Sequence, residues 1–150
     1  SDIPYLFTPG PALCRGRGEQ VEPLAGCGMM HFAVIAPPEG LSTAAVYRAC
    51  RPSETPRRAI ELIHAWRQGN FAEVGRLLHN RLQDAAEGIS PWIDRLAREL
   101  QSSDCLGHRM SGSGTSYFAL CRSATHARFL AATLRGRGLG RTMALTTTPN

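Results

Sequence analysis

The chain has 150 residues, 43% of them hydrophobic, and a formal net charge of +5, which fits one globular domain with a buried core. All 17 basic residues are arginine, which excludes a complete Walker A loop, protein-kinase ATP site or Schiff-base enzyme, because each requires a lysine. No apolar segment approaches the roughly 18 residues that a membrane helix needs, and no signal peptide is evident, so we expect a cytoplasmic protein without a membrane partner.

The first part of the chain predicts short elements. Three prolines within the first eleven residues exclude a long helix there. Ala12–Arg15 and Gln20–Leu24 flank Gly16–Glu19, which predicts two strands joined by a turn. The clearest strand is His31–Ala36. Because nearly every position in it is apolar, we expect it to be central in a sheet and covered on both faces.

Four helices are predicted after this strand, each from a capping residue or a proline followed by apolar residues at helical spacing. Their predicted starts are Ser42 or Thr43, Thr55–Pro56, Asn70 and Ser90–Pro91. The first helix extends through Cys50, and the second stops near Gly69. Asn70 and Glu73 have the spacing of a capping box, although asparagine replaces the usual serine or threonine.

The last third of the chain predicts a strand, a helix and a second strand in that order. The strand Tyr117–Arg122 is followed by a helix that begins at Ser123 and ends at the glycines between positions 136 and 140. Arg141–Thr147 has the alternation of a second strand. We therefore expect an α+β sandwich with an antiparallel sheet covered by helices. The apolar residues that define these patterns include Phe129, Leu130 and Leu134 in the helix and Met143 and Leu145 in the strand.

The turn of small residues between Ser111 and Ser116 is the most informative local feature of the sequence. Gly112 and Gly114 lack a Cβ, so the backbone there can adopt a positive φ and a ligand can approach the main chain closely. Successive amide N–H groups in such a turn can form an anion-binding concavity. By itself this pattern leaves two interpretations open, a plain tight turn and a phosphate contact.

Other candidate sites in the sequence are weak. The five cysteines and five histidines are dispersed, without a Cys-x-x-Cys pair or a convincing metal-ligand spacing, so we expect reduced thiols and no metal site. Arg135–Arg141 alternates arginine with glycine, which superficially suggests nucleic acid. A helix end with glycine caps, where the helix dipole favours cations, explains the segment more simply. We expect no nucleic-acid partner; the alternative, an RNA-binding domain, would show an affinity that falls steeply with salt.

Five motifs occur in this chain in the order found in one enzyme family. They are Ser1-Asp2-Ile3-Pro4-Tyr5-Leu6-Phe7, Gly16-Arg17-Gly18-Glu19, the segment Pro37–Tyr47, Asn80-Arg81-Leu82, and Met110-Ser111-Gly112-Ser113-Gly114. With them the chain resembles the 4-diphosphocytidyl-2-C-methyl-D-erythritol kinases, GHMP kinases of the non-mevalonate isoprenoid pathway. It departs from that family at Arg15, where a small residue usually stands. The family's Gly-rich ATP loop, N-terminal lysine and aromatic-His substrate motif precede the first matched motif and are absent from this sequence.

The resemblance implies an α+β fold, namely the C-terminal domain of a GHMP kinase with a ferredoxin-like antiparallel sheet covered by helices. Residues 1–24 would be a remnant of the first domain, and residues 25–150 would be the C-terminal domain. The implied activity is ATP-dependent phosphorylation of the 2-hydroxyl of the cytidylyl substrate, with ATP and Mg²⁺, although no residue here is expected to fix the metal. We expect the chain to be inactive without the N-terminal ATP-binding half.

The resemblance also assigns the site residues by motif. Asp2 stands at the position of the catalytic aspartate, which accepts the proton of the attacking hydroxyl. Tyr47 resembles the aromatic residue that stacks on the cytosine ring. Ser42 and Thr43 offer hydroxyls nearby, although each also suits a helix cap. The turn residues that would lie near the transferred phosphate are Ser111, Gly112, Ser113 and Gly114.

Two alternatives stay open from the sequence. One is another GHMP kinase, of the homoserine or mevalonate type, although the Ser-Thr-x-x-Val-Tyr segment from Ser42 to Tyr47 favours the cytidylyl substrate. The other is a non-catalytic α+β binding module that has lost its ATP half. A panel of substrates tested on the full-length protein distinguishes the cytidylyl kinase from the other GHMP kinases. An uninterrupted N-terminal coding region upstream would exclude the non-catalytic binding module.

Overall fold

The structure, a computed structural model, describes residues 3–7, 10–26, 28–55 and 59–148. In chain order the elements are α1 (Ile3–Leu6), β1 (Ala12–Arg15), β2 (Gln20–Pro23), β3 (His31–Ala36), α2 (Thr43–Ala49), α3 (Ile60–Arg67), α4 (Phe71–Leu77), α5 (Leu82–Glu87), α6 (Pro91–Gln101), β4 (Gly107–Met110), β5 (Tyr117–Cys121), α7 (Ala124–Gly136) and β6 (Arg141–Thr146). Within the described ranges, no helix has the length and apolar character needed to cross a membrane.

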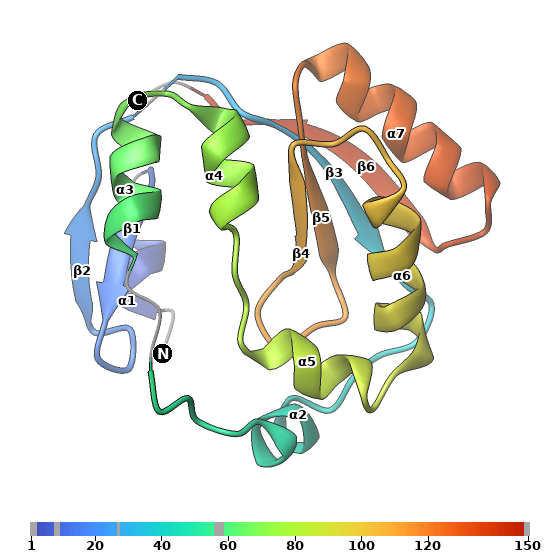
Figure 1. The fold of residues 1–150 in the computed structure, drawn as a ribbon, viewed down its shortest axis with the longest axis horizontal. Helices are drawn as coiled ribbons and strands as arrows, with labels where there is room; N and C mark the ends of the chain where they lie inside the picture. The colour runs from blue at the N-terminus through green and yellow to red at the C-terminus, as the bar shows by residue number, and fades with distance from the viewer. Residues whose placement is uncertain (1–2, 8–9, 27, 56–58, 149–150) are drawn as a thin grey trace.

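The fold is built on a four-stranded antiparallel sheet with the order β4-β5-β3-β6 (Figure 1). β3 pairs with β5 and β6 on its two sides, so that Ile35 lies opposite Tyr117 in β5 and Thr142 in β6. The segment α2–α6 joins β3 to β4, and α7 joins β5 to β6, which gives the ferredoxin-like β-α-β-β-α-β arrangement. The expected α+β fold with an antiparallel sheet is therefore confirmed. β1 and β2 form a separate two-stranded hairpin.

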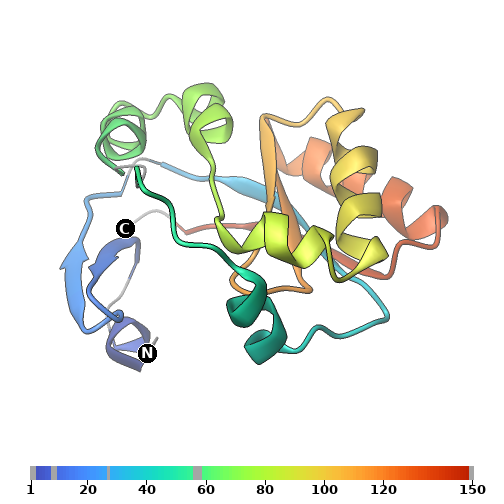
Figure 2. The ribbon, with the colours of Figure 1, turned by 60° about the horizontal axis from the view of Figure 1, so that its bottom comes forward.

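The two faces of the sheet are covered to different extents. α6 and α7 lie on one side of the sheet, whereas α3, α4 and the β1–β2 hairpin lie on the other (Figures 1 and 2). Ala33 and Ile35 of β3 face α6 and α7 and are fully buried, while Phe32 and Val34 face the other side and are only half-buried. β3 is therefore central in the sheet and covered on both faces, as expected, although the second face is covered less completely.

The main core lies between the sheet and the pair α6 and α7. Each fully buried Leu or Ile side chain in it stabilises the fold by about 1.5–3 kcal/mol. α6 contributes at positions three and four residues apart, which is why its sequence predicts a helix with one apolar face. The largest fully buried residues of this core are Ile35, Val46, Ile93, Leu96, Leu100, Met110, Tyr117, Leu134 and Leu139.

A smaller apolar cluster attaches α3 and α4 to the second face of the sheet. Ala65 of α3, Val74 of α4 and Leu120 of β5 are buried together in it. The indole Nε1 of Trp66 donates a hydrogen bond of 2.9 Å to the carbonyl of Ala25, which ties α3 to the segment before β3. This cluster positions the end of α4 next to β4.

Most of the predicted helix caps are confirmed. A side-chain oxygen accepts a backbone N–H at the start of α2 (Ser42), α4 (Asn70), α6 (Ser90) and α7 (Ser123). The predicted start at Thr55–Pro56 falls partly outside the described residues, since Pro56 is not among them. α3 is described from Ile60 onward, and its capping position, Ala59, makes no side-chain hydrogen bond.

The structure differs from the sequence expectations in three elements and three side chains. α1, β4 and α5 were not expected as regular elements. Phe129 is 70% exposed, because it is not part of the stripe of α7 that packs on the sheet. Met143 and Leu145 alternate in β6 with Thr142 and Ala144, which face α7, so they point away from α7 and are 53% and 47% exposed. The residues of the α7 stripe are Ala127, Leu130, Ala131 and Leu134.

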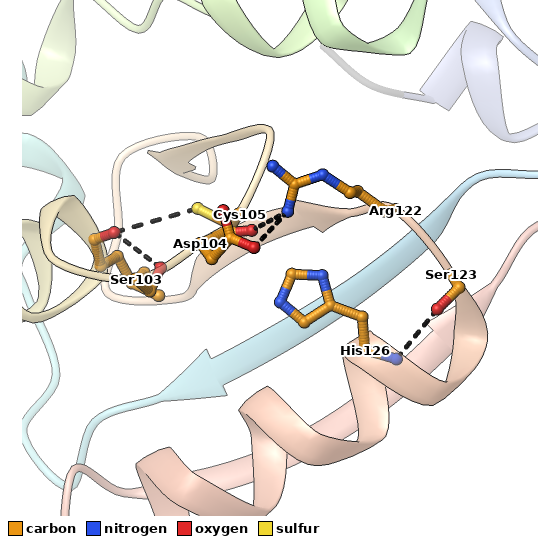
Figure 3. Close-up of polar contacts among 7 residues, drawn as sticks. Ser103, Asp104, Cys105, Arg122, Ser123 and His126 are labelled. Atoms are coloured by element: carbon orange, nitrogen blue, oxygen red, sulfur yellow. Dashed lines mark hydrogen bonds and ion pairs between the residues drawn. The ribbon is translucent and has the colours of Figure 1, made fainter.

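Polar contacts fix the junction between β5 and α7 (Figure 3). Arg122, directly after β5, donates from Nη1 to the carboxylate and to the backbone carbonyl of Asp104, both at 2.6 Å. This guanidinium lowers the pKa of Asp104. Ser123 then caps α7 by accepting the N–H of His126 at 3.1 Å. The pair joins the segment after α6 to the start of α7.

The arginine-rich segment at the end of α7 is bonded within the fold. Arg135 donates to the carbonyl of Thr142 at 2.8 Å, and Arg137 pairs with Glu99 of α6. Gly138 follows with a φ of 68°, the left-handed conformation that commonly ends a helix. These contacts agree with the helix-end interpretation of Arg135–Arg141.

Candidate functional site

The turn between β4 and β5 has the conformation that its glycines predict. The Ser111 N–H donates to the Ser116 carbonyl at 2.8 Å, and the Gly114 N–H donates to the Ser111 carbonyl at 3.0 Å. Gly112 and Gly114 have φ values of 56° and 92°, which residues with a Cβ rarely adopt. A Cβ on Gly114 would also lie only 3.0 Å from the Met110 sulfur. Both glycines are therefore required by the backbone of this turn.

Part of the turn offers its backbone to a ligand. Among the residues that the structure describes, no acceptor bonds the amide N–H of Gly112 or of Ser113. A Cβ built on Gly112 meets no atom within 4 Å, so the main chain is open to solvent there. Successive unpaired amides on an open turn suit an anion such as a phosphate oxygen. The turn can thus bind an anion as well as connect β4 to β5.

The start of α2 contacts this turn. Ser42 caps α2 by accepting the Ala45 N–H at 3.3 Å, which accounts for its hydroxyl structurally. The Thr43 hydroxyl lies 2.9 Å from the Ser113 hydroxyl, so one donates a hydrogen bond to the other. Tyr47 lies one helical turn after Thr43, on the same side of α2, and is 62% exposed. The structure therefore brings Thr43 to the turn and leaves the Tyr47 ring free for a ligand.

The segment between α4 and α5 lies along the open edge of β4. Asn80 donates from Nδ2 to the carbonyls of Met110 and Gly112, both at 2.8 Å, and its Oδ1 accepts the Leu82 N–H at 3.0 Å. Gln83, only 8% exposed, accepts the Met110 N–H at 3.0 Å. β4 is the edge strand of the sheet on this side, so these two side chains complete its hydrogen bonding just before the turn.

Behind the turn, the side chain of the first residue of β5 contacts a half-buried histidine of β4. Tyr117 is fully buried, and its hydroxyl lies 3.1 Å from Nδ1 of His108 in β4. Burial raises the pKa of Tyr117 to about 12, so the hydroxyl keeps its proton. Burial, reinforced by the positive charge of Arg109, lowers the pKa of His108 to about 4. The neutral imidazole and the phenol thus keep β4 and β5 in register at the turn.

His108 makes the stability of the fold depend on pH. As the pH falls from 6.5 towards 4, the unfolded chain binds a proton at His108 that the folded chain does not, so the free energy of unfolding decreases. We expect His108→Gln, which has no titrating group, to lose less stability than the wild type over this range. Urea unfolding between about pH 7 and pH 4.5 measures it. The control is His64→Gln, at an exposed histidine, whose free energy of unfolding should depend on pH as that of the wild type does. If His108→Gln lost as much stability as the wild type between these pH values, His108 would not be the source of the pH dependence.

Asp2 lies outside the described residues, so its role as the catalytic aspartate stays a prediction. No group of three His, Cys, Asp or Glu side chains is arranged to hold a metal ion in the described part of the chain. We therefore assign no Mg²⁺ ligand among the described residues. Asn80 appeared in the sequence only as part of a motif, and nothing in the sequence marked Gln83.

Comparisons with known proteins agree with this geometry. The family model described as "GHMP kinases C terminal" matches residues 59–138. The chain is 35% identical over 137 residues to 4-diphosphocytidyl-2-C-methyl-D-erythritol kinase of Pelotomaculum thermopropionicum, which covers 90% of this chain and 48% of that protein. It is 38% identical over 144 residues to the kinase of the same name from Nocardioides sp., covering 92% of this chain and 48% of that protein.

The solved structures give the same result. A crystal structure of 4-(cytidine 5'-diphospho)-2C-methyl-D-erythritol kinase is similar with a TM-score of 0.81 and 29% sequence identity, covering 97% of this chain and 53% of that one. The chain spans about half the length of the curated relatives that it matches. Sequence motifs, sheet order and family match therefore lead to one conclusion: the chain belongs to the GHMP kinase family and corresponds to its C-terminal domain.

Proposed function

We propose that this chain is the C-terminal part of an ATP-dependent kinase that phosphorylates the 2-hydroxyl of 4-diphosphocytidyl-2-C-methyl-D-erythritol. The substrate is suggested by the names of the relatives. The observation that carries the proposal is the turn with unpaired Gly112 and Ser113 amides, bonded through Thr43 to the helix that presents Tyr47. We call the enzyme formed by this chain and its N-terminal ATP-binding half the joined kinase.

In the proposed reaction, the turn, Tyr47 and Asp2 have different roles. Phosphoryl transfer depends mainly on positioning and on stabilising the charge of the transferred group. The Gly112 and Ser113 amides donate to oxygens of that group, and Tyr47 stacks on the cytosine and holds the other end of the substrate. Asp2 accepts the proton of the 2-hydroxyl. ATP, when bound, would supply the phosphoryl group, and Mg²⁺ bound with it would neutralise part of its charge.

The remaining parts of the proposal concern the chain as a whole. Residues 1–24, with their separate hairpin, belong to the first domain, and residues 25–150 form the second. The chain alone is inactive, and the joined kinase works in the cytoplasm. A homoserine or mevalonate type of GHMP kinase is the second candidate, because those enzymes belong to the same family. A substrate panel on the joined kinase separates the two candidates.

Replacement of Tyr47 tests the assignment of the substrate. Loss of base stacking costs about 1–3 kcal/mol, so Tyr47→Ala should raise the Kd of the joined kinase for the cytidylyl substrate by about 5- to 150-fold. Tyr47→Phe keeps the ring and should stay close to the wild type. Calorimetric titration with the cytidylyl compound measures both variants. Equal Kd values for Tyr47→Ala and the wild type would mean that the ring does not contact the substrate.

A further inference from the structure

We infer that Asn80 is a positioning residue of the joined kinase, which orients the Ser113 amide N–H toward the transferred phosphoryl group. The inference rests on the proposed function, since it explains how the turn is kept ready for a phosphate. Asn80 does not contact the substrate in this account. It acts through the Gly112–Ser113 peptide, whose carbonyl it binds.

The geometry of the peptide bond carries the argument. The carbonyl of Gly112 and the N–H of Ser113 belong to one planar peptide and point in opposite directions in its trans form. Asn80 donates to that carbonyl at 2.8 Å, so the N–H must point away from Asn80. That N–H has no acceptor among the described residues. One side chain therefore sets the direction of a free donor in the site.

The turn needs such an external contact because glycine makes it adaptable. Gly112 adopts a φ of 56° and meets no neighbour on its Cα, so rotation of the following peptide has little steric barrier. A rotated peptide would present its carbonyl, which repels a phosphate, where the N–H had been. The hydrogen bond from Asn80 opposes that rotation, and the Thr43 hydroxyl supports it from the Ser113 side chain.

Asn80 is itself firmly held, as a positioning residue must be. Its Nδ2 bonds both the Met110 and the Gly112 carbonyl, and its Oδ1 accepts the Leu82 N–H at the start of α5. Gln83, on the same short helix, binds the Met110 N–H. Both polar groups of Met110 are thus bonded by this segment, so the turn begins from a fixed residue.

Asn80→Asp tests the inference with almost no change of shape. A carboxylate cannot donate to the two carbonyls, but it accepts an N–H, so it favours the rotated peptide. Loss of one preorganised donor lowers kcat by about 10²–10³-fold, and we expect a loss of this size in the joined kinase with KM little changed. Asn70→Asp is the matched control, since Asn70 caps α4 through Oδ1 alone and aspartate caps equally well. It should stay within about twofold of the wild type.

A second measurement separates positioning from simple stability. Asn80→Ala removes the donors without adding repulsion, so at a temperature where all variants are folded kcat should fall in the order Asn, Ala, Asp. Amide NMR on this chain should show a changed Ser113 N–H shift in Asn80→Asp and an unchanged one in Asn70→Asp. An unchanged Ser113 amide, or a kcat that only follows unfolding, would overturn the inference. If the wild-type joined kinase fails to phosphorylate the cytidylyl compound, the proposed function fails while the NMR result still decides whether Asn80 orients the peptide.

Discussion

Asp2→Asn should lower the kcat of the joined kinase by about 10²–10⁴-fold, the contribution of a well-placed general base. The amide of asparagine has nearly the same shape as the carboxylate, but it does not take up the proton that the 2-hydroxyl loses on attack. Binding of ATP and of the cytidylyl compound should change little, because the proton moves only in the transition state. Steady-state kinetics with separate KM values for both substrates measure the effect.

The control for Asp2 is Asp94→Asn on the surface of α6. Asp94 pairs with Arg98 one helical turn later, an exposed pair of the kind that contributes about 0.3–0.5 kcal/mol. Its removal should leave kcat within about twofold of the wild type. If Asp2→Asn retained activity similar to Asp94→Asn, the transferred phosphoryl group would have to be attacked without help from Asp2, and the motif-based role would be wrong.

Gly75→Ala should destabilise the fold by about 1–3 kcal/mol, although alanine is the better helix former by about 1 kcal/mol. Gly75 lies in α4 where this helix meets β4. A Cβ on Gly75 would overlap the Leu106 carbonyl, and a Cβ on Gly107 would overlap the Gly75 carbonyl. The two backbones therefore touch without side chains between them, and this overlap outweighs the gain in helix propensity.

Gly136→Ala provides the matched control for Gly75. Gly136 is the last residue of α7, and a Cβ there meets no atom within 4 Å. That variant should be as stable as the wild type or more stable by up to about 1 kcal/mol. Urea unfolding of the three proteins gives both differences. If Gly75→Ala were as stable as Gly136→Ala, the close approach of α4 to β4 would not exist in solution.

The contact of Gly75 with Gly107 also has a consequence for the site. α4 ends at Leu77, and the segment that follows it carries Asn80 along the edge of β4. Arg109 in β4 donates to the Leu78 carbonyl at 2.9 Å and fixes the same segment. The close packing of α4 thus places the side chain that, in our inference, orients the turn.

The sequence predicted those helices and strands that are marked by a short apolar run or by a capping residue. β3 and β5 are compact apolar runs, and Ser90 and Ser123 are helix caps that act within three residues. β4 gave no such signal, because Gly-His-Arg-Met has neither alternation nor an apolar run. It is an edge strand, completed partly by side chains rather than by a second strand. Phe129 of α7 is apolar but exposed, because the buried stripe of that helix consists of other residues, two alanines and two leucines.

The sequence predicted the part of the site that lies in one short segment, the glycine turn between β4 and β5. Gly112 and Gly114 indicated a turn with positive φ, and both have it. Asn80 contacts Gly112, which lies 32 positions later in the sequence, and Thr43 contacts Ser113, which lies 70 positions later. No local pattern of residues predicts contacts over such separations. Serine next to threonine at the start of α2 left the cap undecided, and only the structure shows that Ser42 caps while Thr43 contacts the turn.

The central claim is that this chain supplies the second domain of a kinase and has no activity by itself. The most direct test measures ADP formation from Mg-ATP, with and without 4-diphosphocytidyl-2-C-methyl-D-erythritol, for the chain alone and for the joined kinase. The account predicts substrate-dependent ADP formation by the joined kinase and none by the chain alone. Substrate-dependent ADP formation by the chain alone, at a rate that its purity cannot explain, would contradict the account.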